Sequence, residues 1–189
     1  MIPLRVLEAV VVLFPVSEIA LSIFKRSKTP PGQNQDQGSA GLVWIAVALG
    51  VVGAIAAQSV PMARPLWPDQ VVRPIALVLV LSGLAIRWWA ILTLGRFFTV
   101  DVATRRDQPV VRTGPYRFVR HPSYTGALVA FSGIGVFMSN WLSVVVLLVP
   151  ITLAVFIRIR IEERALLAAL GVPYADYCSR TKRLIPGIL

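Results

Sequence analysis

The sequence predicts an all-α integral membrane protein with five transmembrane helices, and three observations support this fold class. Of the 189 residues, 56% are hydrophobic and 15% are charged, and the mean hydropathy is +0.72, whereas soluble domains of this size carry more charge. The apolar residues form runs long enough to cross a bilayer. The basic residues, which give a net charge of +10, gather at the ends of these runs, as in loops at a membrane surface. We therefore expect one membrane domain over residues 1–189.

The first part of the chain, residues 1–94, is predicted to form three of the spans. Its apolar runs are Ile2–Phe24, Gly41–Val60 and Val71–Leu94. At 1.5 Å per residue the first run covers roughly 34 Å, which exceeds the apolar thickness of a bilayer. Lys25–Ala40 separates the first two runs and has no apolar periodicity, so we predict a flexible linker there.

Small and charged residues inside these runs indicate how the helices pack. Ala46, Gly50 and Ala54 are spaced four apart in the second run, which lets a neighbouring helix approach closely. Glu18 lies near one end of the first run, within reach of the headgroups. Arg87 lies late in the third run beside two tryptophans, and we expect its side chain to extend to the interface rather than to bind a substrate.

The second part of the chain is predicted to contain the other two spans. Tyr124–Ser139 and Trp141–Ile157 form a tight helical hairpin, because almost nothing separates the two apolar runs. Helical periodicity then continues over Arg158–Leu170, beyond the membrane. Gly171 can cap this helix, since glycine readily takes the left-handed conformation that follows many helices. A short helix over Pro173–Arg183 is expected next.

A polar, basic and turn-rich stretch, Thr113–Gly126, lies between apolar runs and contains the only histidine, His121. Gly114-Pro115 and His121-Pro122 interrupt the backbone, because proline fixes φ and disfavours helix in the preceding residue. These breaks predict a shaped loop that offers hydroxyl and imidazole groups at the membrane surface. The plainer interpretation is a basic loop that only sets topology.

The charges also predict the orientation of the chain. With the amino terminus outside, the cytoplasmic segments are Lys25–Ala40, Gly95–Ser123 and Arg158–Leu189, which hold fifteen of the nineteen Lys and Arg residues. The positive-inside rule therefore predicts five spans with the amino terminus outside and the carboxyl terminus in the cytoplasm. We expect a multi-pass protein of the cell membrane in a prokaryote or of the endoplasmic reticulum in a eukaryote.

Composition excludes several kinds of site. One cysteine, Cys178, excludes an internal disulfide and a thiolate-rich metal centre. One histidine and nine acidic residues leave no evident cluster for a transition metal, so we expect no metal. We also expect no nucleic acid partner, because topology and anionic lipid headgroups account for the basic residues.

The predicted topology places several ionisable and polar side chains at one end of the bundle. Arg158 and Glu162 are four residues apart and share one helical face. The predicted hairpin places them near His121 and the tyrosines of the turn-rich stretch, at the cytoplasmic headgroup level. A salt bridge within the helix beside a lipid-binding loop would account for the same pattern, and both interpretations remain open at this point.

The same residues resemble a known family. The isoprenylcysteine carboxyl methyltransferase family is similar over residues 101–183, through Glu162-Glu163, Gly171-x-x-Tyr174-x-x-Tyr177 and the motif Gly114-x-Tyr116-x-x-x-Arg120-His121-Pro122-Ser123-Tyr124-x-Gly126. The first three spans carry little of this resemblance. Phospholipid N-methyltransferases and some membrane sterol reductases are related in the same region.

The resemblance implies S-adenosylmethionine as cofactor and S-adenosylhomocysteine as product. The site would lie at the cytoplasmic face, between the last two helices, the loop before them and the carboxyl-terminal tail, within residues 95–189. Arg158 would bind the methyl acceptor and act in catalysis together with Glu162. By motif position, the cofactor would contact Gln108, Pro109, Val110, Val111, Tyr116, His121, Pro122, Ser123, Tyr124 and Glu162.

The resemblance implies a lipid-like or prenylated substrate, with the carboxylate of a prenylated cysteine as the expected acceptor. A carboxylate is ionised at neutral pH and needs no general base, and a guanidinium such as that of Arg158 can hold it with two hydrogen bonds. The first alternative is a phospholipid amine N-methyltransferase, which needs a base such as Glu163 or His121. The second is a non-catalytic membrane scaffold or small transporter, although a transporter usually shows repeated halves.

Overall fold

The computed structural model describes residues 4–24, 36, 38–60, 63, 68–99 and 109–188. The described residues are helical, with no named strand among them. The described residues contain six α-helices and two 3₁₀ turns in this order: α1 Leu4–Phe24, α2 Ser39–Ala57, α3 Asp69–Leu94, η2 Gly95–Phe97, η3 Gly114–Arg117, α4 Pro122–Phe137, α5 Trp141–Leu170 and α6 Val172–Arg180.

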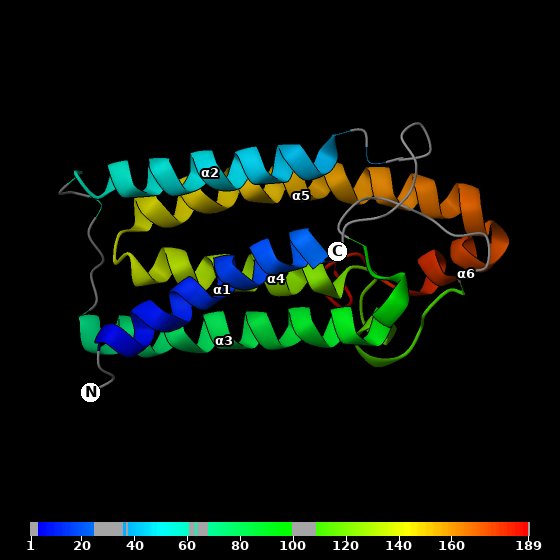
Figure 1. Ribbon diagram of the computed structural model, residues 1–189, viewed down its shortest axis with the longest axis horizontal. Coiled ribbons are helices and arrows are strands. Elements are labelled where there is room, and N and C mark those ends of the chain that lie inside the picture. Colours follow the sequence, from blue (N-terminus) through cyan, green and yellow to red (C-terminus); the bar gives the residue numbers. More distant parts are fainter. Residues whose placement is uncertain are drawn as a thin grey trace.

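The long helices lie side by side as two packed pairs. Figure 1 shows α2 along α5 and α3 along α4, with α1 crossing the α3–α4 pair and α6 beyond the end of α5. The tight turn between α4 and α5 joins the two pairs. Segments from the two ends of the sequence are therefore neighbours, which no local pattern reveals.

Glycines set the distance between α3 and α4. A methyl group added at Gly126 would lie 2.6 Å from both the Gly83 carbonyl oxygen and the Arg87 amide nitrogen, and one added at Gly133 would lie 2.8 Å from the Ala76 carbonyl oxygen. Only a residue without a side chain lets the two backbones approach this closely.

The contact of α2 with α5 confirms the predicted role of the small residues in α2. Ala46, Gly50 and Ala54 are buried, and a methyl group at Gly50 would meet the Leu147 carbonyl oxygen at 3.0 Å. At the far end of this pair, the buried Ser143 hydroxyl donates to the Ala54 carbonyl oxygen at 2.7 Å. Buried polar groups are therefore satisfied across the helix pair.

The carboxyl-terminal tail returns to the turn-rich stretch. Arg120 donates its amide to the Lys182 carbonyl oxygen at 2.8 Å, and His121 donates its amide to that of Arg183 at 3.0 Å. The Thr125 hydroxyl donates to the Leu184 carbonyl oxygen at 2.8 Å. The start of α4 and the tail thus form one unit at the same end of the bundle.

A helix covers most of each predicted apolar run, and three helices meet the length and hydropathy of a membrane span: Ser39–Ala57, Asp69–Phe97 and Trp141–Leu170. The apolar parts of the other two are shorter, at Val12–Leu21 and Pro122–Phe137. The chain is a membrane protein. The extension of α5 to Leu170 and the cap at Gly171, with φ of 58°, are confirmed.

Two predictions in the first part of the chain are wrong. The second helix begins at Ser39 rather than Gly41, because the Asp36 carboxylate accepts the Ala40 amide at 3.0 Å. The end of the predicted flexible linker is thus ordered. Arg87 does not extend to the interface: its guanidinium is largely buried and pairs with Glu18 of α1, which hydropathy patterns along a single helix cannot show.

Candidate active site

A cavity of about 400 Å³ lies inside the bundle, and residues of all six α-helices line it. This volume is typical of a small-molecule site. The deeper wall is apolar and comes from four helices: Phe14, Val47, Val51, Phe131, Ile134, Ile151 and Val155. On α5 the lining runs from Ile151 through Arg158 and Glu162 to Leu170, a distance of roughly 28 Å along the helix.

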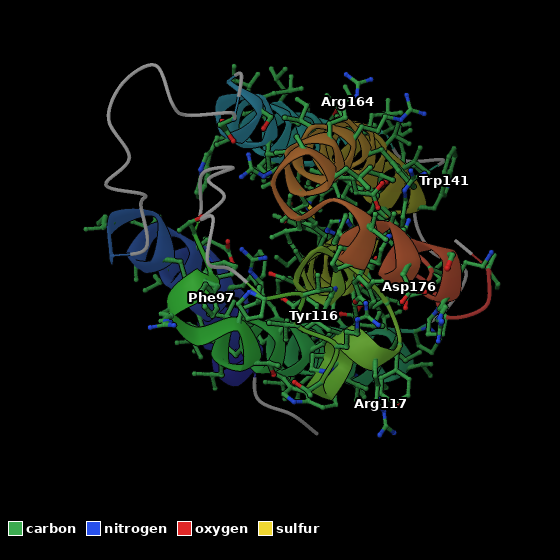
Figure 2. The ribbon with its side chains drawn as sticks, turned by 90° about the vertical axis from the view of Figure 1, so that its right-hand side faces the viewer. Phe97, Tyr116, Arg117, Trp141, Arg164 and Asp176 are labelled. Atoms are coloured by element: carbon green, nitrogen blue, oxygen red, sulfur yellow. The ribbon has the colours of Figure 1, made fainter. Side chains whose placement is uncertain are left out.

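The polar residues gather at one end of this cavity. They come from η3 and the start of α4, from the second half of α5, from α6, and from Glu18 of α1 and Arg87 of α3. Figure 2 looks onto this end and shows Tyr116 near its centre, whereas Arg117 and Arg164 lie at its outer edges. The cavity is therefore a long apolar chamber with a polar end, which suits a ligand with both a charged and an apolar part.

The hydroxyl of Tyr124 links the two residues predicted to act in catalysis. It accepts a hydrogen bond from Arg158 Nε at 2.7 Å and donates one to Glu162 Oε2 at 2.9 Å. Arg158 is 6% exposed, while the Glu162 side chain is 30% exposed. All three residues line the cavity.

Arg158 is already committed to partners within the protein. Besides Tyr124, its Nη1 atom donates to Asp36 Oδ1 at 2.6 Å and to the Ser39 hydroxyl at 2.8 Å. The guanidinium is thus a charge fixed in the cavity wall. The sequence-based prediction instead has it holding a substrate carboxylate with two hydrogen bonds.

The neighbouring glutamate, Glu163, has a different environment. Its Oε1 atom accepts from Arg120 Nε at 2.8 Å and lies 3.3 Å from His121 Nε2, and its Oε2 atom accepts from Arg183 Nη2 at 2.8 Å. Glu163 is 7% exposed and is not among the residues that line the cavity. We call these four residues the Glu163 cluster; it joins α4, α5 and the tail.

A second ion pair lies in the cavity wall. Arg87 of α3 pairs with Glu18 of α1 and donates from Nη1 to the Ser123 hydroxyl at 2.9 Å. All three residues line the cavity. A charge inside an apolar span usually has a partner in another span, but Arg5, Glu8 and Arg73 also lie in the predicted spans, so the sequence does not single out this pair.

Tyrosines form another part of the polar end. The Tyr177 hydroxyl donates to the Tyr116 carbonyl oxygen at 2.6 Å, and burial raises the pKa of both tyrosines, so both remain protonated at neutral pH. Arg112 donates to the Pro173 carbonyl oxygen at 2.8 Å and to Asp176 at 3.1 Å. The segment that carries Pro109, Val110 and Val111 is thereby tied to α6.

Comparison with known proteins agrees with this geometry. The sequence model of the isoprenylcysteine carboxyl methyltransferase family matches residues 76–168. Over this region the chain is similar to that family. The match covers α4, most of α5 and most of α3, which contribute Arg87, Tyr124, Arg158 and Glu162 to the cavity.

Individual members of the isoprenylcysteine carboxyl methyltransferase family align with more than half of the chain. Protein-S-isoprenylcysteine O-methyltransferase B of Arabidopsis thaliana is 33% identical over 112 residues, which are 58% of this chain and 57% of that protein. The Saccharomyces cerevisiae protein-S-isoprenylcysteine O-methyltransferase is 33% identical over 113 residues, 59% of this chain and 47% of that protein. The chain thus spans about half the length of these relatives.

A solved structure of that family is similar over almost the whole of this chain. The eukaryotic intramembrane Ras methyltransferase ICMT superposes with a TM-score of 0.60 at 25% identity, over 96% of this chain and 65% of the other. The similarity therefore includes the first three helices, where the sequence alone shows little resemblance.

The cavity brings together most of the site residues that family resemblance predicts. Those that line it are Pro109, Val110, Val111, Tyr116, His121, Ser123, Tyr124, Arg158 and Glu162. Pro122 is buried at the first turn of α4 and does not line the cavity. Gln108 lies outside the described residues. His121, predicted on a loop, is the N-cap residue of α4 and is 4% exposed.

Sequence reasoning missed several lining residues. The Glu18–Arg87 pair is one case, and Tyr174 and Tyr177 are another, since they were noted only as part of a motif. The residues of α1 and α2 that line the apolar chamber have no distinctive pattern in the sequence. Among the described residues, no group of three or more His, Cys, Asp or Glu side chains could hold a metal ion.

Proposed function

We propose that this chain is an S-adenosylmethionine-dependent methyltransferase whose acceptor is the carboxylate of a prenylated cysteine or a similar lipid-attached carboxylate. One observation carries the proposal: a single cavity joins an apolar chamber to a polar end that holds Arg158, Tyr124 and Glu162. A lipid tail fits the apolar chamber, and a charged group fits the polar end. The relatives named as isoprenylcysteine O-methyltransferases add support.

The residues at the polar end fit the cofactor. S-adenosylmethionine carries an amino group, a carboxylate, an adenine ring and a sulfonium cation, and it supplies the methyl group. Glu162, the more exposed of the two carboxylates that line the cavity, would accept from a cationic group. The tyrosines that line the cavity would pack against the adenine or the sulfonium.

The chain needs no general base for this reaction. A carboxylate is already ionised at neutral pH, so the protein has to orient it, attract it and exclude water. Arg158 places a buried positive charge on the cavity wall, and the apolar chamber on one side of it excludes water.

The amine methyltransferase alternative has less support. It needs a base near the acceptor, and Glu163 already accepts hydrogen bonds from Arg120 and Arg183. A carboxylate held by two guanidinium groups is a weak base. His121 Nε2 lies against the same carboxylate. Glu163 is therefore not poised to take a proton from an amine acceptor.

The direct test is methyl transfer from labelled S-adenosylmethionine by the purified chain in lipid. A farnesylcysteine analogue, phosphatidylethanolamine and a fatty acid serve as acceptors. Transfer to the farnesylcysteine carboxylate is the expected result. Transfer to phosphatidylethanolamine alone would favour the amine methyltransferase, and transfer to none of the three would contradict the proposal.

The cofactor assignment predicts the behaviour of Glu162→Gln. The substitution keeps an acceptor for the Tyr124 hydroxyl but removes the negative charge. Because Glu162 is partly exposed, we expect a loss of about tenfold in the affinity for S-adenosylhomocysteine. Isothermal titration in detergent measures this affinity. Affinity equal to that of the unmodified chain would contradict the role of Glu162.

The proposed orientation, with five spans and the carboxyl terminus in the cytoplasm, predicts how Cys178 reacts. An impermeant maleimide should not label it in intact cells but should label it after permeabilisation, with Cys178→Ala as the control for non-specific labelling. Burial raises the pKa of this thiol, although nearby Arg120 offsets part of the effect. Because the thiolate reacts, the labelling rate should rise steadily as the pH increases above neutrality. Labelling from outside intact cells would overturn the orientation.

A further inference from the structure

The Arg158 guanidinium is held from the side of α2. Its Nη1 atom donates to Asp36 Oδ1 at 2.6 Å and to the Ser39 hydroxyl at 2.8 Å. The side chains of Arg158 and Asp36 are 7% and 8% exposed. A buried ion pair of this kind is well defined in geometry, because each charge lacks water as an alternative partner.

Asp36 is itself fixed by the start of α2. Its Oδ2 atom accepts from the Ala40 amide at 3.0 Å, its Oδ1 atom accepts from the Ser39 hydroxyl at 3.0 Å, and its carbonyl oxygen accepts from the Ser39 amide at 2.8 Å. The amino end of a helix also favours a negative charge. Burial alone would raise the pKa of Asp36, but the Ala40 amide and the Arg158 charge outweigh burial and lower the pKa.

Asp36 contacts Arg158 from outside the cavity. Arg158, Tyr124 and Ala40 line the cavity, whereas Asp36 and Ser39 are not among its lining residues. The carboxylate of Asp36 therefore fixes the guanidinium from behind the cavity wall. A ligand in the cavity would approach the guanidinium from the opposite side.

We propose that Asp36, together with Ser39, is a positioning residue that fixes the Arg158 guanidinium so that its charge faces the carboxylate of the methyl acceptor. This inference rests on the proposed function. An arginine side chain has several rotatable bonds, and holding it in one conformation before the acceptor binds removes an entropic cost from binding. Asp36 and Ser39, which lie outside the family match at residues 76–168, thereby take part in acceptor recognition.

The test is the isosteric change Asp36→Asn, assayed with the full chain in lipid and a farnesylcysteine analogue as acceptor. Asparagine still offers an oxygen to the Ala40 amide but no longer pairs with Arg158 as a charge. We expect KM for the acceptor to rise about tenfold, with kcat and the affinity for S-adenosylhomocysteine changed less than twofold. Ser39→Ala, which removes only the hydroxyl, should raise KM about threefold and serves if Asp36→Asn does not fold.

Asp69→Asn is the matched control. Asp69 also lies at the start of a helix and pairs with an arginine, Arg73, but it is exposed and remote from the cavity. We expect this control to leave KM unchanged. Asp36→Asn should also add little to Arg158→Lys in the double variant, because a positioning residue acts through the residue that it positions.

Each other outcome overturns the inference. A lower KM in Asp36→Asn would mean that Asp36 competes with the acceptor carboxylate for Arg158. Asp36 would only support the fold if Asp36→Asn weakened cofactor affinity as much as it raised KM for the acceptor. The same would follow if the effects of Asp36→Asn and Arg158→Lys on KM multiplied in the double variant, as independent effects do. If the unmodified chain turns over the acceptor and Asp36→Asn does so equally well, the inference alone fails. If the unmodified chain neither binds nor methylates the acceptor, the proposed function fails and the inference fails with it.

Discussion

Replacing Glu163 by glutamine is expected to lower the free energy of unfolding by about 3–5 kcal/mol, because removal of one partner from a buried ion pair leaves the others uncompensated. His121 is buried beside this carboxylate, Arg120 is partly buried beside it, and Arg183 reaches it from the tail. Without the negative charge, two guanidinium groups would lie close together with no counter-ion between them. Thermal or denaturant unfolding in detergent measures the loss.

The adjacent residue supplies the control. Glu162→Gln changes the same functional group one position along α5, but Glu162 is partly exposed on the cavity. We expect its unfolding free energy to change by less than about 1 kcal/mol, while cofactor binding weakens. If Glu163→Gln unfolds like the unmodified chain but loses activity, Glu163 is a catalytic base, and the amine methyltransferase alternative gains support.

Replacing Arg158 by lysine is expected to reduce kcat/KM for a farnesylcysteine acceptor roughly ten- to hundredfold. The guanidinium reaches Tyr124 with Nε and both Asp36 and Ser39 with Nη1. An ammonium group has its donors on one atom and cannot reach these partners in the same geometry while it also faces the acceptor. Binding of S-adenosylhomocysteine should persist, which separates acceptor recognition from cofactor binding.

Arg160→Lys is the matched control, since Arg160 lies on the same helix but is exposed. Its kinetics should equal those of the unmodified chain. Normal turnover of the carboxylate acceptor by Arg158→Lys would contradict the role of Arg158. Undiminished transfer to phosphatidylethanolamine, with no transfer to the carboxylate, would instead favour an amine acceptor.

Hydropathy and the positions of helix-capping and turn residues in the sequence determined the helical fold class and most helix ends. Apolar runs predict α2, α3 and α5 because a bilayer requires helices that satisfy their own backbone. Asn140 and Gly171 lie at the two ends of α5. A short polar side chain can accept a hydrogen bond from a backbone amide of the first turn, and a glycine can adopt the positive φ that ends the helix. Such information is local, and a single sequence therefore contains it. The spacing of His121, Tyr124, Arg158 and Glu162 likewise indicated one end of the bundle as the site.

Only the tertiary structure decided which charged residues act together. Asp36 and Arg158 are separated by 122 positions and Glu18 and Arg87 by 69, and nothing in the local pattern around any of them indicates its partner. Glu162 and Glu163 look equivalent in the sequence, yet a helix turns by about 100° per residue, so one faces the cavity and the other faces Arg120 and Arg183. The packing of distant helices, rather than the residue type, therefore decides that Glu162 lies in the candidate site whereas Glu163 holds the fold together.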